Sequence, residues 1–135
     1  MADAVKSGAD SPEIEIEVRF SQAKDAGVDD LLWCDGLIIG TPENFGYMSG
    51  AVKDFLDRTF YPLEGKIQAL PYAIFISAGN DGSGALSSIR RIGNGYPFKE
   101  VMDPVVVKGE VCEEDLVKCQ EMGMTMAAGL EAGIF

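Results

Sequence analysis

The sequence has no histidine, only three cysteines and no long apolar run, and each shortage removes a class of function. Without histidine, a Ser-His-Asp triad, imidazole acid–base catalysis and histidine-ligated metal sites are excluded. Cys34, Cys112 and Cys119 are odd in number and lack CxxC spacing, which argues against a disulfide framework and a zinc site. No run approaches the ~18 apolar residues that cross a bilayer. We therefore expect no catalytic side chain and no metal site, and a cofactor that carries the chemistry of any enzyme.

Positive charge is also scarce, with 11 Lys and Arg residues against 22 Asp and Glu residues and a net charge of −11. This field repels a phosphate backbone, so we expect no nucleic-acid partner. A phosphorylated ligand would have to be held by local donors, because the global field opposes it. The first residues lack the basic and apolar regions of a signal peptide, so we expect a cytoplasmic protein with no membrane partner.

The apolar pattern alternates between strands and helices along all 135 residues. It predicts helices at 2–8, 28–34, 49–59, 83–92 and 113–129, and strands at 13–20, 36–40, 72–77 and 101–107. The strand at 13–20 places apolar residues strictly on one side and charged residues on the other, which is typical of a half-buried edge strand. The last strand is interrupted at Asp103-Pro104. The order predicts a single α/β domain, 1–135, with a doubly wound parallel sheet and helices on both faces.

The loop from Thr41 to Gly50 leaves the end of an interior strand, where open α/β sheets bind their ligands. A planar ring with polar edges needs backbone amides at close range. Pro42 stiffens the turn, and Gly46 permits a backbone conformation that other residues resist. Phe45 or Tyr47 can pack against such a ring. The alternative is that these aromatic residues only seal the end of the sheet.

A second loop, from Ser77 to Gly84, is rich in glycine and follows the next interior strand. It can pass beside the same ring, although glycine-rich loops are as often only turns. Arg90 and Arg91 lie at the negative end of the helix that follows this loop. Stabilising that helix end is the favoured interpretation for both arginines, and binding an NADPH phosphate is the alternative.

Residues 40–58, GTPENFGYMSGAVKDFLDR, resemble the ring-binding segment of NADPH-dependent FMN reductases. They are also similar to the tryptophan-repressor-binding-protein type of quinone reductase, within the flavodoxin-like superfamily. The resemblance extends more weakly through Gly65-Lys66, the strand and loop at 74–84, and the last helix. It implies a flavodoxin-like fold, FMN as cofactor, NAD(P)H as co-substrate and a small-molecule electron acceptor. The FMN-binding residues that we infer from the loops and the resemblance are Thr41, Pro42, Glu43, Asn44, Phe45, Gly46, Tyr47, Met48, Ala78, Gly79, Asn80, Asp81 and Gly82.

The sequence departs from this resemblance at its start. The families begin with a strand and a hydroxyl-rich turn that wraps the FMN phosphate, whereas residues 1–8 resemble the middle of the helix that follows. Losing three or four charge-assisted phosphate bonds removes on the order of 5 kcal/mol, or more than about a thousandfold in affinity. Relative to the family, we expect a chain that lacks the first strand, through truncation or a mistaken start, or one that fills the gap from a partner subunit.

Three functions remain open from the sequence. The first is an NAD(P)H-dependent FMN or quinone reductase. The second is a cofactor-free or weakly flavin-binding relic that acts as a binding or assembly module, and the third is a flavodoxin-type electron carrier. Most of the related proteins are dimers or tetramers, so we expect a homo-oligomer with the methionine-rich last helix as a reasonable interface.

Overall fold

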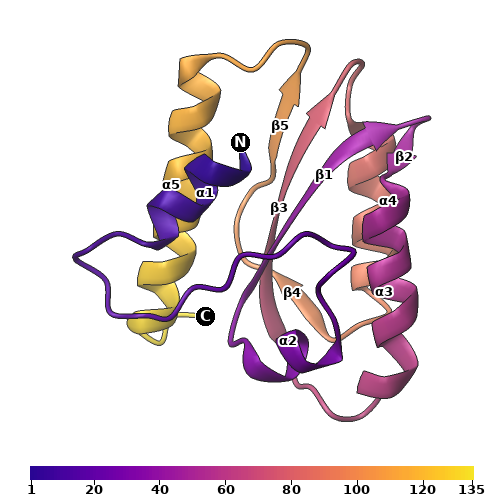
Figure 1. Cartoon of the computed structure of the whole chain (residues 1–135), viewed down its shortest axis with the longest axis vertical. Helices are drawn as coiled ribbons and strands as arrows, with labels where there is room; N and C mark the ends of the chain where they lie inside the picture. Colours follow the sequence, from indigo (N-terminus) through magenta and orange to yellow (C-terminus); the bar gives the residue numbers. More distant parts are fainter.

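The computed structural model describes residues 1–135 as a sheet between two layers of helices (Figure 1). Helices α1 and α5 cover one face of the sheet, and α3 and α4 cover the other. In chain order the elements are α1 (Ala2–Ala9), α2 (Val28–Trp33), β1 (Leu37–Asn44), β2 (Tyr47–Met48), α3 (Gly50–Leu63), β3 (Leu70–Ala78), α4 (Ser83–Gly93), β4 (Phe98–Glu100), β5 (Val105–Lys108) and α5 (Glu113–Glu131). None of the helices is long and apolar enough to cross a membrane.

The sheet is parallel except at its short hairpin. Its strands lie in the order β2-β1-β3-β4, and β5 pairs with the later part of β3. β1 and β3 run together from Leu37 opposite Tyr72 to Pro42 opposite Ser77. β2 is antiparallel to the end of β1 and pairs only with its last two residues. The predicted parallel sheet with helices on both faces is confirmed.

The predicted helices match α1, α2, α4 and α5 to within two residues. The helix predicted to end at Thr59 continues to Leu63 and includes Pro62 in its last turn. Leu63 is buried there, and its packing in the main core offsets the backbone hydrogen bond that Pro62 cannot donate. The strand predicted at 101–107 is divided into β4 and β5, and the interruption falls at Asp103-Pro104 as predicted.

The predicted strand at 13–20 is wrong. The segment is irregular, and Glu15–Phe20 make no hydrogen bond between backbone groups. Alternating side chains describe which face a strand would bury, but the strand forms only if a neighbour completes its ladder of hydrogen bonds. The chain has the pattern of a strand here and no partner beside it.

The two faces of the sheet are packed unequally. A cluster of 15 buried residues fills the space between the sheet and α2, α3 and α4. The face toward α5 has a cluster of only three buried residues: Ala73, Met122 and Met126. The α1 helix packs principally against α5. At their crossing, a Cβ added to Gly123 would lie 2.0 Å from the Val5 carbonyl oxygen, so the two backbones are in direct contact.

We predict that Gly123→Ala destabilises the protein. In a helix, alanine is more stable than glycine by about 0.5–1 kcal/mol. At Gly123, however, the added methyl group would collide with the backbone of α1, which cannot rotate away as a side chain can. The free energy of unfolding should fall by about 1–3 kcal/mol, measured by urea denaturation. Gly50→Ala is the matched control, because a Cβ there meets nothing within 4 Å. Equal effects of the two substitutions would show that the helix crossing is not the cause.

Candidate functional site

The pairing of β1 with β3 brings two loops to one edge of the sheet. Pro42 and Ser77 are opposite each other at the last pair of the parallel ladder. The chain leaves β1 through the hairpin into β2 and leaves β3 through residues 79–82, so both predicted ligand loops begin side by side. This is the edge at which parallel sheets bind ligands.

The β1–β2 hairpin turns through two residues with left-handed backbone conformations. Asn44 pairs with Tyr47, and between them Phe45 has φ 52° and Gly46 has φ 68°. Two central residues with positive φ define a type I′ turn, which glycine adopts freely and phenylalanine does not. Phe45 is the one residue other than glycine with a positive φ, and its side chain is fully exposed. An aromatic ring is thus held in solvent on a strained backbone, which is typical of residues that contact ligands.

The hairpin is fixed to the start of α4 by hydrogen bonds. The Ala85 N–H donates to Glu43 Oε2 at 3.0 Å, so a carboxylate lies at the positive end of the helix dipole. The Met48 N–H donates to Ser88 Oγ at 3.2 Å. Gly84 has no room for a side chain, because a Cβ there would lie 1.9 Å from the Gly46 carbonyl oxygen. The hairpin is therefore a rigid projection.

The link from β2 to α3 is ordered by two hydroxyl groups. Thr41 Oγ1 accepts a hydrogen bond from the Ser49 N–H at 2.9 Å and donates to its neighbouring carbonyl. Ser49 Oγ accepts from the Val52 N–H at 3.4 Å, which confirms Ser49 as the N-cap of α3. Both hydroxyls are engaged within the protein, so they position the loop.

The second loop is ordered by a local hydrogen-bonded turn at Asp81, just before α4. Asp81 Oδ1 accepts hydrogen bonds from the backbone and the hydroxyl of Ser83, and these bonds lower the pKa of Asp81. Gly82 has φ 74°, and a Cβ there would lie 2.6 Å from Val106. Gly79 and Asn80 are exposed beside the hairpin.

The thirteen residues predicted to bind FMN therefore divide by exposure. Eight are exposed at this edge: Pro42, Asn44, Phe45, Gly46, Tyr47, Gly79, Asn80 and Asp81. Four are buried beneath it, namely Thr41, Met48, Ala78 and Gly82. Glu43 is half-buried, and one of its oxygens already has a partner on α4. The exposed group is free to touch a ligand, whereas the others support the loops from below.

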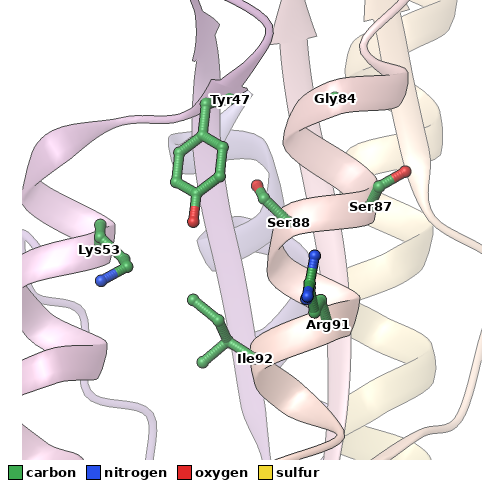
Figure 2. Close-up of a pocket in the computed structure, with 7 residues that line it drawn as sticks. All are labelled: Tyr47, Lys53, Gly84, Ser87, Ser88, Arg91 and Ile92. Atoms are coloured by element: carbon green, nitrogen blue, oxygen red, sulfur yellow. The ribbon is translucent and has the colours of Figure 1, made fainter.

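A groove of about 560 Å³ begins at Tyr47 and runs between α3 and α4 (Figure 2). It is lined by Tyr47, Lys53, Gly84, Ser87, Ser88, Arg91 and Ile92. Lys53 is paired with Asp57 at 2.6 Å, and this hydrogen bond raises the pKa of Lys53. Arg91 is exposed and has no ion pair or hydrogen bond within the protein, whereas its neighbour Arg90 is paired with Glu100 at 2.6 Å. The sequence did not indicate Lys53 or Ser87, because they are brought together only by helix packing.

Comparison with solved structures identifies the class of fold. An archaeal flavodoxin superposes with a TM-score of 0.78 at 23% identity, covering 95% of this chain and 86% of that one. A WrbA-like flavodoxin protein from Agrobacterium tumefaciens gives a TM-score of 0.72 at 21% identity over 93% and 84% of the two chains. The fold is flavodoxin-like.

Sequence comparison identifies the family. Residues 13–111, most of the chain, match the model of the NADPH-dependent FMN reductase family, and the chain belongs to that family. A flavodoxin from Aquifex aeolicus is 34% identical over 94% of this chain and 77% of its own length. An NAD(P)H dehydrogenase (quinone) from Acidithiobacillus ferrooxidans is 40% identical over 46% of this chain and 32% of its own.

The site fits one half of an FMN molecule. The hairpin offers an exposed aromatic ring and exposed backbone at Gly46, and the neighbouring loop offers exposed backbone at Gly79 and Asn80. These groups suit a planar ring with polar edges. Thr41 Oγ1 is engaged on both sides, since it accepts from the Ser49 N–H and donates to the Pro42 carbonyl, and Ser83 Oγ donates to Asp81. The ring half of the cofactor therefore has a place at this edge.

We predict that Phe45→Asn stabilises the protein. Asparagine tolerates the left-handed conformation and precedes Gly46 in the sequence most favoured for a type I′ turn. Because the phenylalanine ring is fully exposed, its loss removes no core contact. The free energy of unfolding should rise by about 1 kcal/mol in urea denaturation. Tyr61→Asn, at an exposed aromatic residue in α3, should give no such gain. If Phe45→Asn lowered the free energy of unfolding, the inference that the Phe45 backbone is strained would be wrong.

Proposed function

We propose that this protein is an FMN-dependent oxidoreductase that takes hydride from NAD(P)H and delivers electrons to a small-molecule acceptor. The observation that carries the proposal is the hairpin tip, where Phe45 is both strained and fully exposed. The Phe45 side chain packs against nothing in the core and its backbone is strained, so phenylalanine at this position lowers the stability of the protein. Stacking on a bound planar cofactor would give this side chain a function. Membership of the NADPH-dependent FMN reductase family supports the same chemistry.

The protein's own residues bind and orient the cofactor in this proposal. Phe45 packs against the flavin ring, and the exposed backbone of Gly46, Gly79 and Asn80 supplies hydrogen bonds to the polar edge of the ring. The anchoring of Glu43 on α4 keeps the hairpin in place before the ligand arrives, which lowers the entropy that binding must overcome. FMN, when bound, supplies the hydride and electron transfer, and no side-chain acid or base is required.

A flavodoxin-type electron carrier is the second candidate. The 34% identity with the Aquifex flavodoxin over most of both chains favours it. The two functions differ in what reduces the flavin. An oxidoreductase consumes NAD(P)H in multiple turnovers when an acceptor is present, whereas a carrier is reduced by a partner protein and leaves the nicotinamide unused. Steady-state oxidation of NADPH with FMN and a quinone therefore separates them.

We predict that FMN binds to the hairpin edge and that Phe45→Asn weakens this binding about three- to tenfold, from the loss of one aromatic contact. The measurement is quenching of FMN fluorescence on titration with protein, repeated with riboflavin. Tyr61→Asn should leave the affinity unchanged. Because Phe45→Asn is expected to be more stable, weaker binding cannot be attributed to unfolding. Absence of FMN binding by the unaltered protein would overturn the oxidoreductase and carrier proposals together.

We further propose that the groove between α3 and α4 holds the additional phosphate of NADPH, the one that NADH lacks. It begins at Tyr47 beside the ring site, and Arg91 lies about two helical turns beyond Gly84 along α4 (Figure 2). In a protein with a net charge of −11, a phosphate needs a local cation, and the guanidinium of Arg91 has no other partner. A nicotinamide over the flavin ring would place its distant phosphate along this groove.

We predict that Arg91→Ala raises the KM for NADPH about tenfold and leaves the KM for NADH unchanged, because NADH lacks the additional phosphate. Steady-state kinetics with saturating FMN measures both constants. Lys99→Ala, which removes an exposed cation on β4, is the matched control for the loss of one positive charge. An equal rise in the KM for NADPH in both variants would show that the effect comes from the net charge of the protein and not from a contact with Arg91.

A further inference from the structure

Lys108 is the only cation that ends a strand at the edge of the sheet where the two ligand loops lie. β5 finishes at Lys108, which is opposite Ala78, the residue that precedes Gly79 of the second loop. Paired strands are about 5 Å apart, so the backbone of Lys108 lies directly beside the start of this loop. The Gly109 N–H donates to the Ala78 carbonyl at 2.8 Å and fixes this register just beyond the strand. A positive charge is therefore held next to the predicted ring site.

The side chain of Lys108 lies on the same side of the sheet as the second loop. Alternation along β5 puts Lys108 on the face of Val106. Val106 packs against the main core, and a Cβ on Gly82 would lie 2.6 Å from it. The pKa of Asp81 is lowered by its hydrogen bonds from Ser83 and, less strongly, by the charge of Lys108. The register of the strand and the charges thus agree on the position of this ammonium group.

The ammonium group of Lys108 is free to act on a ligand. Lys108 is exposed and takes part in no ion pair. The carboxylate of Asp81 is already held by Ser83 through Oδ1. The protein has a net charge of −11, so a negative charge that develops at this edge is opposed by the overall field and stabilised by Lys108.

The proposed reaction creates such a charge. A neutral flavin ring that takes a hydride gains one negative charge, and the nicotinamide that gives the hydride gains one positive charge. The net charge of the protein opposes the new charge on the ring. A cation beside the ring offsets this opposition, and charge near the ring is one of the means by which a protein tunes a flavin.

We propose that Lys108 stabilises the reduced flavin ring through the charge of its ammonium group. This inference rests on the proposed function, because it requires the ring to lie at the hairpin edge. Lys108 then favours reduced over oxidised flavin and raises the midpoint potential of the bound cofactor. It acts on the difference between the two states because the oxidised ring is neutral, whereas the phosphate of FMN is present in both.

Lys99 provides a matched control within the same sheet. Both lysines are exposed, both lie opposite a residue of β3, and neither takes part in an ion pair. Lys99 is opposite Pro71 and Lys108 is opposite Ala78, so the two are about 23 Å apart along the strand direction. This separation exceeds the Debye length of about 10 Å at 0.1 M salt, so the charge of Lys99 is largely screened from the ligand edge. Replacing either lysine changes the net charge of the protein equally.

The test measures the midpoint potentials of riboflavin and FMN bound to the full chain, by anaerobic titration against a reference dye. Lys108→Gln should weaken the binding of reduced flavin about three- to tenfold relative to the oxidised form, which lowers the potential by about 15–30 mV for a two-electron couple. Oxidised riboflavin, which has no phosphate, should bind this variant as tightly as the unaltered protein. Lys108→Arg should keep the original potential, and Lys99→Gln should leave it unchanged. The shift should shrink as salt is added.

No shift with Lys108→Gln, or equal shifts with Lys108→Gln and Lys99→Gln, would overturn the proposal, since the position of the charge would then have no effect. Equal weakening of oxidised and reduced riboflavin by Lys108→Gln would also overturn it, because Lys108 would then support the loop and not the charge on the ring. All these results leave flavin binding, and with it the proposed function, intact. Absence of flavin binding by the unaltered protein would overturn both together, so the two failures are distinguishable.

Discussion

The parallel pairing of β1 with β3 determines where every other part of the proposed function lies. It fixes Pro42 opposite Ser77, so the chain must leave both strands at the same edge of the sheet. The hairpin can then meet the start of α4, where Glu43 accepts the Ala85 N–H. If the two strands slipped by one residue, their side chains would exchange faces and the hairpin would no longer reach α4. The pairing of the apolar strands β1 and β3 thus determines where Glu43 and the other polar groups of the hairpin lie.

The two edges of β1 have different surroundings. β3 pairs with one edge, whereas the other edge borders a groove of about 1110 Å³. The sheet face toward α5 also has the smaller core. Phe75 shows the consequence, because its ring lies against Gly40 and a Cβ on Gly40 would overlap it, yet Phe75 remains partly exposed to the groove. The predicted ring site and the groove therefore lie at opposite ends of β1.

The sequence predicted those features that depend on local interactions. The helices α2, α4 and α5, the Ser49 cap and the break at Asp103-Pro104 follow from side chains that act on their own or nearby backbone. The strand at 13–20 was wrong because strand formation depends on a neighbour that no local pattern describes. The groove beside Arg91 was missed for a related reason, since Lys53 and Ser87 meet only after α3 and α4 have packed.

Phe45 shows that local sequence preferences for turns do not account for every residue of the hairpin. A rule for type I′ turns would place asparagine or glycine before Gly46, and the sequence has a phenylalanine. The hairpin keeps its geometry because Glu43 and Met48 hydrogen-bond to α4 from its two strands, and because Gly84 of α4 leaves room for the Gly46 carbonyl. Tertiary contacts thus impose a backbone conformation that the residue itself disfavours. The exposed ring makes no contact with the core, so the strain at this position is not offset by packing. In the proposed function, the lost stability is the cost of presenting an aromatic surface to the flavin.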